Sequence, residues 1–302
     1  MIDAFIHVIL TIFFPPLLLG VITRMKAIFA GRRGAPLLQP YYDILRLMRK
    51  GSVFSTTTTW VFRAGPLVTL CSILTASLMI PLGHHPPPIS FAGDVILFAY
   101  LFGLARFFTT VSALDTGSSF EGMGAAREVT FSTLAEPTLF FAVITLARLS
   151  HSLSLSEILT FVTPQRWLSV GACMILLTVA LFIVLLAENC RIPFDDPTTH
   201  LELTMIHEVM VLDHSGPLFG AILYGASVKL FVLSALFVDV AFPFTTGSPL
   251  LDWPLLILKL LVTAIAIGVV ESVMARLRLV RVPQLLVGAT ILSAFALLLI
   301  LR

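Results

Sequence analysis

The sequence predicts an all-α integral membrane protein, a single polytopic membrane domain over residues 1–302. Apolar residues make up 58% of the chain, charged residues only 12%, and the mean hydropathy is +1.01. Because soluble domains carry roughly 25% charged residues, this composition excludes most soluble enzymes and makes lipid the expected solvent. About eight spans are predicted, at residues 4–23, 66–82, 91–113, 129–149, 167–187, 217–241, 253–275 and 284–301.

The first apolar run, Ala4–Thr23, precedes a dense basic cluster and has no positive charge before it, which is the reverse of a secretory signal. We therefore expect a retained first helix. Loop charges then predict the orientation, because 13 of the 19 Lys and Arg residues lie in the first, third, fifth and seventh loops. Since positively charged loops stay in the cytoplasm, we expect these loops in the cytoplasm and both termini outside.

A short amphipathic helix is expected inside the first loop. Between Tyr41 and Lys50, apolar residues recur at helical spacing against charged ones. This pattern is typical of a helix that lies in the membrane interface after the first span. Binding to anionic lipid explains it, and so does docking of a cytoplasmic partner.

The charged residues taken as internal to the predicted spans are Asp94, Arg106, Glu136, Lys229, Asp239, Lys259 and Glu271. Charges at this depth are costly, so they are usually functional or paired with one another. Some are alternatively structural pairs, or side chains that extend to the interface from near a helix end. Lys229 and Glu271 are the candidates for an ion path deep in the membrane.

The acidic residues gather in or beside the third and fifth loops. Ten of the 17 lie there: Asp115, Glu121, Glu128, Glu136, Glu188, Asp195, Asp196, Glu202, Glu208 and Asp213. Carboxylates crowded near a low dielectric raise one another's pKa toward neutrality, so they can take up and release protons. The alternative is a set of solvated acids with ordinary pKa values, which fits Glu136 least because it lies in an apolar run.

The fifth loop combines prolines, acids and histidines. Pro193 and Pro197 fix the backbone around Asp195 and Asp196, and His200, His207 and Glu208 are expected on one face of a following helix. The two histidines are seven residues apart, about 10 Å along a helix, which is not the spacing of the zinc motif H-E-x-x-H. A proton relay or interface hydrogen bonds fit this segment better than a metal site.

No motif for a redox cofactor is present. The three cysteines are far apart, and the chain lacks a Walker loop, a dinucleotide fingerprint, a nucleophile elbow and a C-x-x-C-H haem motif. We therefore expect no cofactor bound by this chain, no catalytic residue of its own, and no binding of nucleic acid.

Four motifs on the predicted cytoplasmic loops carry a resemblance to a known family. They are GRRGAPLLQPYYDILRLMRKG at 31–51, LDTGSSFEGMGAAREVTFSTLAEP at 114–137, ENCRIPFDDPTTHLEL at 188–203 and ESVMARLRLVRVP at 271–283. The chain resembles the eight-helix membrane subunit of complex I (subunit 1, or H), in the branch found in formate hydrogenlyase, hydrogenase-4 and other membrane-bound [NiFe] hydrogenases.

The resemblance implies an anchor for electron-transfer subunits, with a path for protons, or sodium ions, that begins beneath them. Glu121, Glu128, Glu136, Glu188, Asp195 and Glu202 match acids of the family's path. Arg32, Arg33 and Arg191 match basic positions that brace the partner contact, to which Gln39, Arg46, Asp213 and His214 are added as interface candidates. The implied partners are homologues of hydrogenase large and small subunits, an iron–sulfur subunit and antiporter-like membrane subunits, which would carry the [NiFe] centre and iron–sulfur clusters in a prokaryotic inner membrane.

Two departures from complex I select the branch. Complex I subunits carry extra glycine-rich residues between two elements of the first motif, whereas here the first element, Arg33–Pro36, runs directly into the second, Leu37–Pro40. In addition, Asp213–Gly216 stands where the family has E-Y-S-G. Both departures favour a hydrogenase-type complex over a quinone-binding subunit of an NADH dehydrogenase. A free-standing secondary transporter and a purely structural anchor are the remaining alternatives. The absence of an internal repeat and the basic first loop favour a subunit of a complex over a solitary transporter.

Overall fold

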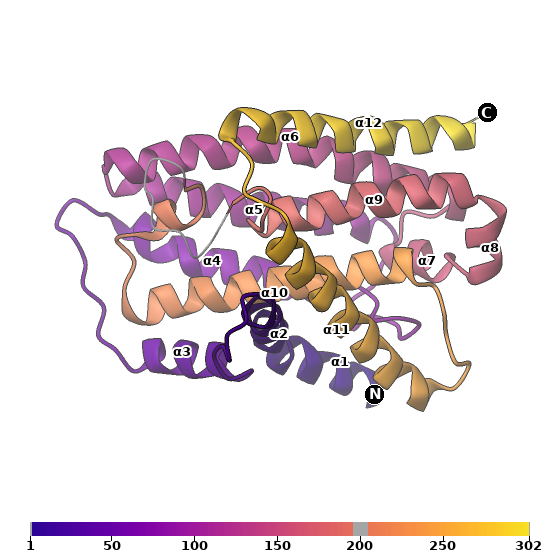
Figure 1. Ribbon diagram of the computed structural model, residues 1–302, viewed down its shortest axis with the longest axis horizontal. Coiled ribbons are helices and arrows are strands. Elements are labelled where there is room, and N and C mark those ends of the chain that lie inside the picture. The colour runs from indigo at the N-terminus through magenta and orange to yellow at the C-terminus, as the bar shows by residue number, and fades with distance from the viewer. Residues whose placement is uncertain (1, 196–204, 302) are drawn as a thin grey trace.

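The computed structural model describes residues 2–195 and 205–301, and its regular structure is helical (Figure 1). The predicted site residues Asp196 and Glu202, and also His200, lie outside the described residues. The helices are α1 Ile2–Phe13, α2 Pro15–Phe29, α3 Gln39–Met48, α4 Trp60–Ser77, α5 Asp94–Asp115, α6 Ser119–Ser150, α7 Leu155–Thr160, α8 Pro164–Ser169, α9 Gly171–Glu188, the 3₁₀ turn η1 Glu208–Val211, α10 Gly216–Ala241, α11 Pro249–Val273, the 3₁₀ turn η2 Leu279–Arg281 and α12 Val282–Leu301.

The described residues contain seven helices long and apolar enough to cross a membrane, and an eighth span if the bent pair α1–α2 is counted as one. The predicted membrane fold is therefore confirmed at the level of seven to eight candidate spans. Both termini lie at one end of the bundle (Figure 1), together with the connections 78–93, 151–170 and 242–248. We call this the terminal end. The opposite end, which we call the basic end, carries the connections between α2 and α4 and between α5 and α6, and residues 205–211, which precede α10.

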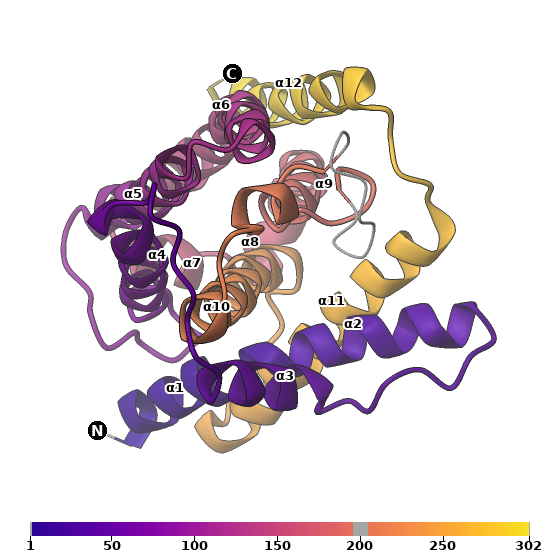
Figure 2. The ribbon, with the colours of Figure 1, turned by 90° about the vertical axis from the view of Figure 1, so that its left-hand side faces the viewer.

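The first span is not the single helix 4–23 that the apolar run predicts. The chain breaks after Phe13, and α2 starts at Pro15 with an axis 47° away from that of α1. Proline has no N–H to donate and fixes φ, so Pro15 and Pro16 are favourable at the start of a helix and unfavourable inside one. Figure 2 shows α2 running away from α1, and α2 continues to Phe29, beyond the predicted end at Thr23.

The third-loop acids lie on a helix and not in the predicted loop. Helix α6 begins at Ser119, ten residues before the expected start, and runs for 32 residues through Pro137. Gly117, in the left-handed region at φ 71°, turns the chain out of α5, and extended Ser118 precedes the first helical residue. Glu121, Glu128 and Glu136 therefore lie on one helix. The polar residues before 129 made the predicted start of this span too late.

Two other predictions differ clearly from the structure, the bounds of the second span and the helix of the fifth loop. Helix α4 covers 60–77 and not 66–82, because the Thr59 side chain accepts the Val61 N–H and caps the helix earlier. The α-helix predicted around His207 and Glu208 is absent from residues 205–211, where only the short turn η1 forms. A short helix does form in the first loop, as α3.

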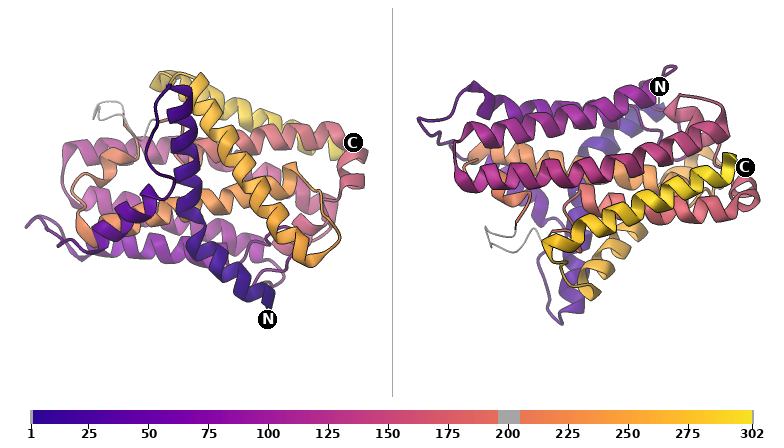
Figure 3. Two further views of the ribbon diagram at one scale, coloured as in Figure 1. Left: turned by 60° about the horizontal axis from the view of Figure 1, so that its bottom comes forward. Right: turned by 90° about the horizontal axis from the view of Figure 1, so that it is seen from above.

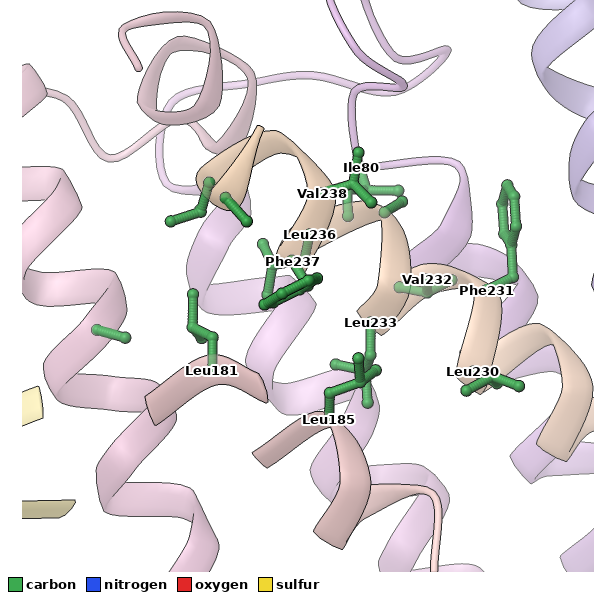
Figure 4. Packing of buried hydrophobic residues seen from close by; sticks show 14 of the residues in the cluster. Ile80, Leu181, Leu185, Leu230, Phe231, Val232, Leu233, Leu236, Phe237 and Val238 are labelled. Atoms are coloured by element: carbon green, nitrogen blue, oxygen red, sulfur yellow. The ribbon is translucent and has the colours of Figure 1, made fainter. Parts of the chain in front are cut away.

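Helix α10 lies at the centre of the bundle (Figure 2). It is buried along 72% of its most apolar stretch, against 22–44% in the other spans. Figure 4 shows Leu230–Val238 of α10 packed with Leu181 and Leu185 of α9 and with Ile80. This layer is continuous and apolar apart from Ser234, so it forms a dry core between the terminal end and the basic end of the bundle.

Helices α2 and α11 cross closely (Figure 3) because Gly268 faces α2. A Cβ placed on Gly268 would lie 2.7 Å from the Met25 Cβ, whereas one on Gly103 of α5 would meet nothing within 4 Å.

We predict that Gly268→Ala destabilises the protein by roughly 1–3 kcal/mol, since overpacking forces α2 and α11 apart. Gly103→Ala is the matched control and should be neutral or slightly stabilising, because alanine favours a helix more than glycine does. Thermal unfolding of the purified protein in detergent measures both, and equal melting temperatures for the two variants would contradict the prediction.

Candidate functional site

A network of five charged side chains joins four helices in the interior. Glu188, at the end of α9, accepts from Lys229 Nζ of α10 at 2.8 Å and from Arg106 Nη2 of α5 at 2.6 and 2.8 Å. Arg106 also contacts two acids of α6, Glu136 directly and Glu128 at 4.0 Å. We call Lys229, Glu188, Arg106, Glu128 and Glu136 the central network.

The network is largely enclosed. The exposed fraction of the Glu188 side chain is 8%, that of Arg106 is 13% and that of Lys229 is 19%. Ion pairs so placed are stabilised by one another because water does not screen them. Glu136 differs, since 45% of its side chain is exposed at the edge of the network. The network therefore runs from the centre of the bundle at α10 to a lateral surface on α6.

A cavity of about 520 Å³ lies beside the central network. Its charged wall includes Arg106, Glu128, Glu188 and Lys229, and it extends toward α2 and α3 past apolar side chains such as Leu19 and Ile44. Glu208 and His207 of the η1 region also line it. The cavity thus brings together charges from helices that are far apart in the sequence.

A second charged cluster lies on the same cavity. Glu271 of α11 is fully buried and pairs with Lys26 Nζ of α2 at 3.1 Å and with Arg191 Nη1 at 3.4 Å. The predicted first span ends at residue 23 and leaves Lys26 in the first loop, but α2 continues to Phe29 and therefore includes Lys26. Arg191, expected at a partner interface, has 13% of its side chain exposed and points to Glu271.

Asp195 holds the fifth loop against the seventh. Its Oδ2 accepts the backbone N–H groups of Ile206 and His207 at 2.9 and 3.3 Å, and its Oδ1 accepts from Arg276 at 2.7 Å. A buried carboxylate with three donors is a strong structural tie. Asp195 also lines the cavity, so it is placed both to order the loop and to face the network.

Glu121 and His214 are buried near the start of α10. The Glu121 Oε1 accepts the Asp213 N–H at 3.0 Å, and the His214 ring stacks on Phe62 with 4.0 Å between ring centroids. Burial lowers the pKa of His214, although the Phe62 carbonyl raises it in part. His214 is therefore not on the free surface expected of an interface residue. Asp213, in contrast, is exposed.

The basic first-loop candidates lie on the surface of the basic end. Arg32, Arg33 and Arg46 are exposed, and Gln39 donates to Asp43 Oδ1 at 2.9 Å. Among the described residues, no group of three or more His, Cys, Asp or Glu side chains is arranged to hold a metal ion.

The sequence matches the family described as NADH dehydrogenase over residues 2–302. The chain belongs to this family. It is 35% identical over 277 residues to formate hydrogenlyase subunit 4 of Escherichia coli strain K12, covering 89% of each chain. It is also 30% identical over 279 residues to hydrogenase-4 component C of the same organism, covering 90% of this chain and 87% of that one.

The fold agrees with this membership. A chain of the membrane-bound sulfane sulfur reductase, an archaeal respiratory membrane complex, superposes with a TM-score of 0.85 at 22% identity, over 99% of this chain and 98% of the other. The resemblance seen in the four loop motifs is confirmed, and the chain is a multi-pass membrane member of the NADH dehydrogenase family whose curated relatives are named for hydrogenase and hydrogenlyase components.

Sequence reasoning treated Arg106 only as one more charge within a span. Its role as the centre of the network became visible only in the fold, because its partners lie 30 and 82 residues away. The missed signal is the balance of charge: the predicted spans contain few cations, and each is costly inside the bundle unless acids surround it.

We predict that Arg106→Gln destabilises the protein by about 3–5 kcal/mol, because it leaves Glu188 and Glu128 with less compensating charge in the interior. Arg148→Gln, at the exposed end of the same α6 that carries Glu128, is the control and should change stability by less than about 0.5 kcal/mol. Denaturation in detergent measures the difference. A tolerated Arg106→Gln would show that the network contributes nothing to the fold.

Proposed function

We propose that this chain is the coupling subunit of a multi-subunit membrane-bound hydrogenase or formate hydrogenlyase-type complex. In this role it anchors the electron-transfer subunits and passes protons, or sodium ions, along its acidic side chains. The observation that carries the proposal is the central network, in which acids and cations alternate from Lys229 to Glu136 beside a cavity. Carboxylates and the Lys229 amine within reach of one another can hand on a proton by exchanging partners, while the Arg106 guanidinium, which keeps its proton, holds the acids together.

The remaining predicted path residues extend this route toward the basic end. Glu208 and Asp195 line the same cavity, and Glu271 reaches it through Lys26 and Arg191. Glu121 lies seven residues, about two helical turns, before Glu128 on α6. Asp196 and Glu202 belong to the same proposal on sequence grounds. The redox chemistry is assigned to partner subunits that carry a [NiFe] centre and iron–sulfur clusters.

We assign the basic end to the cytoplasm and to the electron-transfer partner. Its excess of Lys and Arg follows the rule for cytoplasmic loops, and Arg32, Arg33 and Arg46 are free to meet an acidic protein surface. Asp213 lies on the same end, and Gln39, Arg191 and His214 shape the loops beneath it.

The half-exposed Glu136 supports a membrane partner as well. A carboxylate exposed to lipid on a transmembrane helix is costly, and its neighbours on the α6 surface, Phe140 and Ile144, are also exposed. A second membrane subunit of the antiporter-like kind, covering this face, would remove that cost. The route from Lys229 would then continue across the subunit boundary.

Glu136→Gln should lower the number of ions translocated per electron severalfold while the complex still assembles, because glutamine keeps the size and loses the ionisable group. Asp195→Asn combined with Asp196→Asn should do the same. Proteoliposomes containing the purified complex, with a pH-sensitive dye, measure the ratio. Glu157→Gln, on the short helix α7 at the terminal end, is the matched control. Unchanged stoichiometry in an assembled complex would establish the chain as a structural anchor instead.

The cavity favours one second candidate, a site for the ring of a quinone as in an NADH dehydrogenase. Its volume of about 520 Å³ and its combination of apolar and charged walls suit an amphipathic ring. The test is Ala226→Phe, which fills part of the cavity. If a quinone reacts there, the KM for a soluble quinone should rise at least tenfold. If the complex is of the hydrogenase type, hydrogen turnover should persist and no quinone dependence should exist in the parent complex.

A further inference from the structure

The terminal end contains a second group of buried titratable side chains that the central network does not include. Asp3, His7 and Thr11 are spaced four residues apart on α1 and so share one face. His85 comes from the segment between α4 and α5, and Asp239 from the last turns of α10. His7, Thr11, His85 and Asp239 are all more than nine-tenths buried.

These residues are neighbours. His85 Nδ1 lies 3.3 Å from Asp3 Oδ1, and the His85 ring stacks on Trp253 of α11 with 3.9 Å between centroids. His7 and His85 interact electrostatically, and the Asp239 carboxylate accepts a hydrogen bond from the backbone N–H of Gly83, two residues before His85. Three helices and one connecting segment therefore meet around a single group of side chains.

In each of the two histidines, one ring nitrogen has a hydrogen-bond or ion-pair partner and the other has none within the described residues. His7 Nε2 lies 2.9 Å from the Ser77 carbonyl, which can only accept, so Nε2 carries the proton in the neutral ring. His85 Nδ1 faces the Asp3 carboxylate in the same way. The remaining nitrogens, His7 Nδ1 and His85 Nε2, are then proton acceptors.

Four buried atoms of this group have no hydrogen-bond partner within residues 2–195 and 205–301: His7 Nδ1, Thr11 Oγ1, His85 Nε2 and Asp239 Oδ2. A buried polar atom left unpaired destabilises the fold, so four of them in these adjoining segments are a large cost. Buried water molecules relieve such a cost because each makes about three hydrogen bonds. The described residues offer no set of three metal-ligating side chains, which leaves water as the ligand that fits.

We propose that Asp3, His7, His85 and Asp239 form a hydrated proton-exchange site at the terminal end of the chain, separate from the central network and open to the medium through Asp3. Asp3 provides the opening because 48% of its side chain is exposed, against 7% of the His85 side chain. A proton bound from water at His85 Nε2 allows the proton on Nδ1 to leave to Asp3. One N–H bond forms and another breaks, so one proton moves and nothing is oxidised.

The dry core of α10 isolates this site from the central network. Asp239 and Lys229 are ten residues apart on one helix, about 15 Å along its axis. Between them, Leu230, Phe231, Val232, Leu233, Leu236 and Val238 are at most 4% exposed. The site therefore exchanges protons with the terminal side only, and it senses the pH of that side.

Other charged groups at this end set the background for any pH response. His84 lies on the same segment as His85, and Asp252 and Lys259 lie on α11. Lys259 Nζ is held by the Phe242 and Phe244 carbonyls at 2.7 and 2.5 Å, and Asp252 by Thr246. Burial lowers the pKa of His84. Lys259 interacts electrostatically with Asp239, and Asp252 interacts with His84 and His85, so both charges influence the pH response of the site.

The first test locates the water and does not depend on ion translocation. Electron cryo-microscopy of the intact complex, at a resolution that shows water, should reveal ordered water within hydrogen-bond distance of His7 Nδ1, His85 Nε2 and Asp239 Oδ2. The Asp239→Leu complex should lose the water on Oδ2. If these atoms are dry, or if another subunit's side chains fill their places, the proposal is overturned.

The second test rests on the proposed function and measures exchange. The complex in proteoliposomes is assayed for ion translocation while the pH on the terminal side is varied from 5.5 to 8.5 and the pH on the basic side is held constant. His85→Gln and Asp239→Asn should reduce the response to this pH at least threefold. His151→Gln is the control, because His151 is an exposed histidine at the same end.

The outcomes are distinguishable. An unchanged pH response in His85→Gln and Asp239→Asn, with the control also unchanged, would overturn proton exchange at this site. If the parent complex translocates no ion at all, the proposed coupling function fails, and the water positions in the first test still decide whether the hydrated site exists.

Discussion

The structure depends on the charge of Glu188, which must be compensated because it lies at the inner end of an almost wholly apolar helix. Lys229 and Arg106 provide that compensation from two other helices, and Arg106 in turn recruits Glu128 and Glu136 from a fourth. The apolar contacts among α5, α6, α9 and α10 allow many small shifts of register, whereas the ion pairs allow few. The position of the cavity follows, since its charged wall consists of these same side chains.

The same arrangement recurs toward the basic end. Glu271 connects α2, α11 and the fifth loop through Lys26 and Arg191, and Asp195 connects the fifth loop to Arg276. The acids that we propose for the ion path are thus also ties between segments. If they carry an ion, it can move only when a tie exchanges one partner for another, so transport would require small conformational changes. Glu136, with the most exposed carboxylate of the network, needs the smallest change.

Hydropathy predicted the membrane fold and most of the spans, because the length of an apolar run is a local property of the sequence. It failed where local polarity and backbone chemistry compete. Pro15 splits an apolar run into two helices, and α6 continues through polar residues such as Glu121 and Arg127 because the segment 205–213 provides hydrogen-bond partners for them. The acids of the site were recognisable as costly charges. Their partners were not, because Arg106 meets Glu188 across 82 residues of sequence.

The dry core around α10 finally constrains any route for ions. Leu230–Val238 close the direct way between the central network and the terminal end, and no polar side chain but Ser234 interrupts this layer. On the proposed function, a proton that reaches Lys229 and Glu188 from the basic end has an easier exit sideways, past the permanently charged Arg106, to Glu136 on the α6 surface. A lateral exit has no use in a solitary protein, since it opens on lipid. The exposed carboxylate of Glu136 therefore supports our proposal that another membrane subunit continues the path there, while the proposed site at the terminal end would exchange protons with its own side.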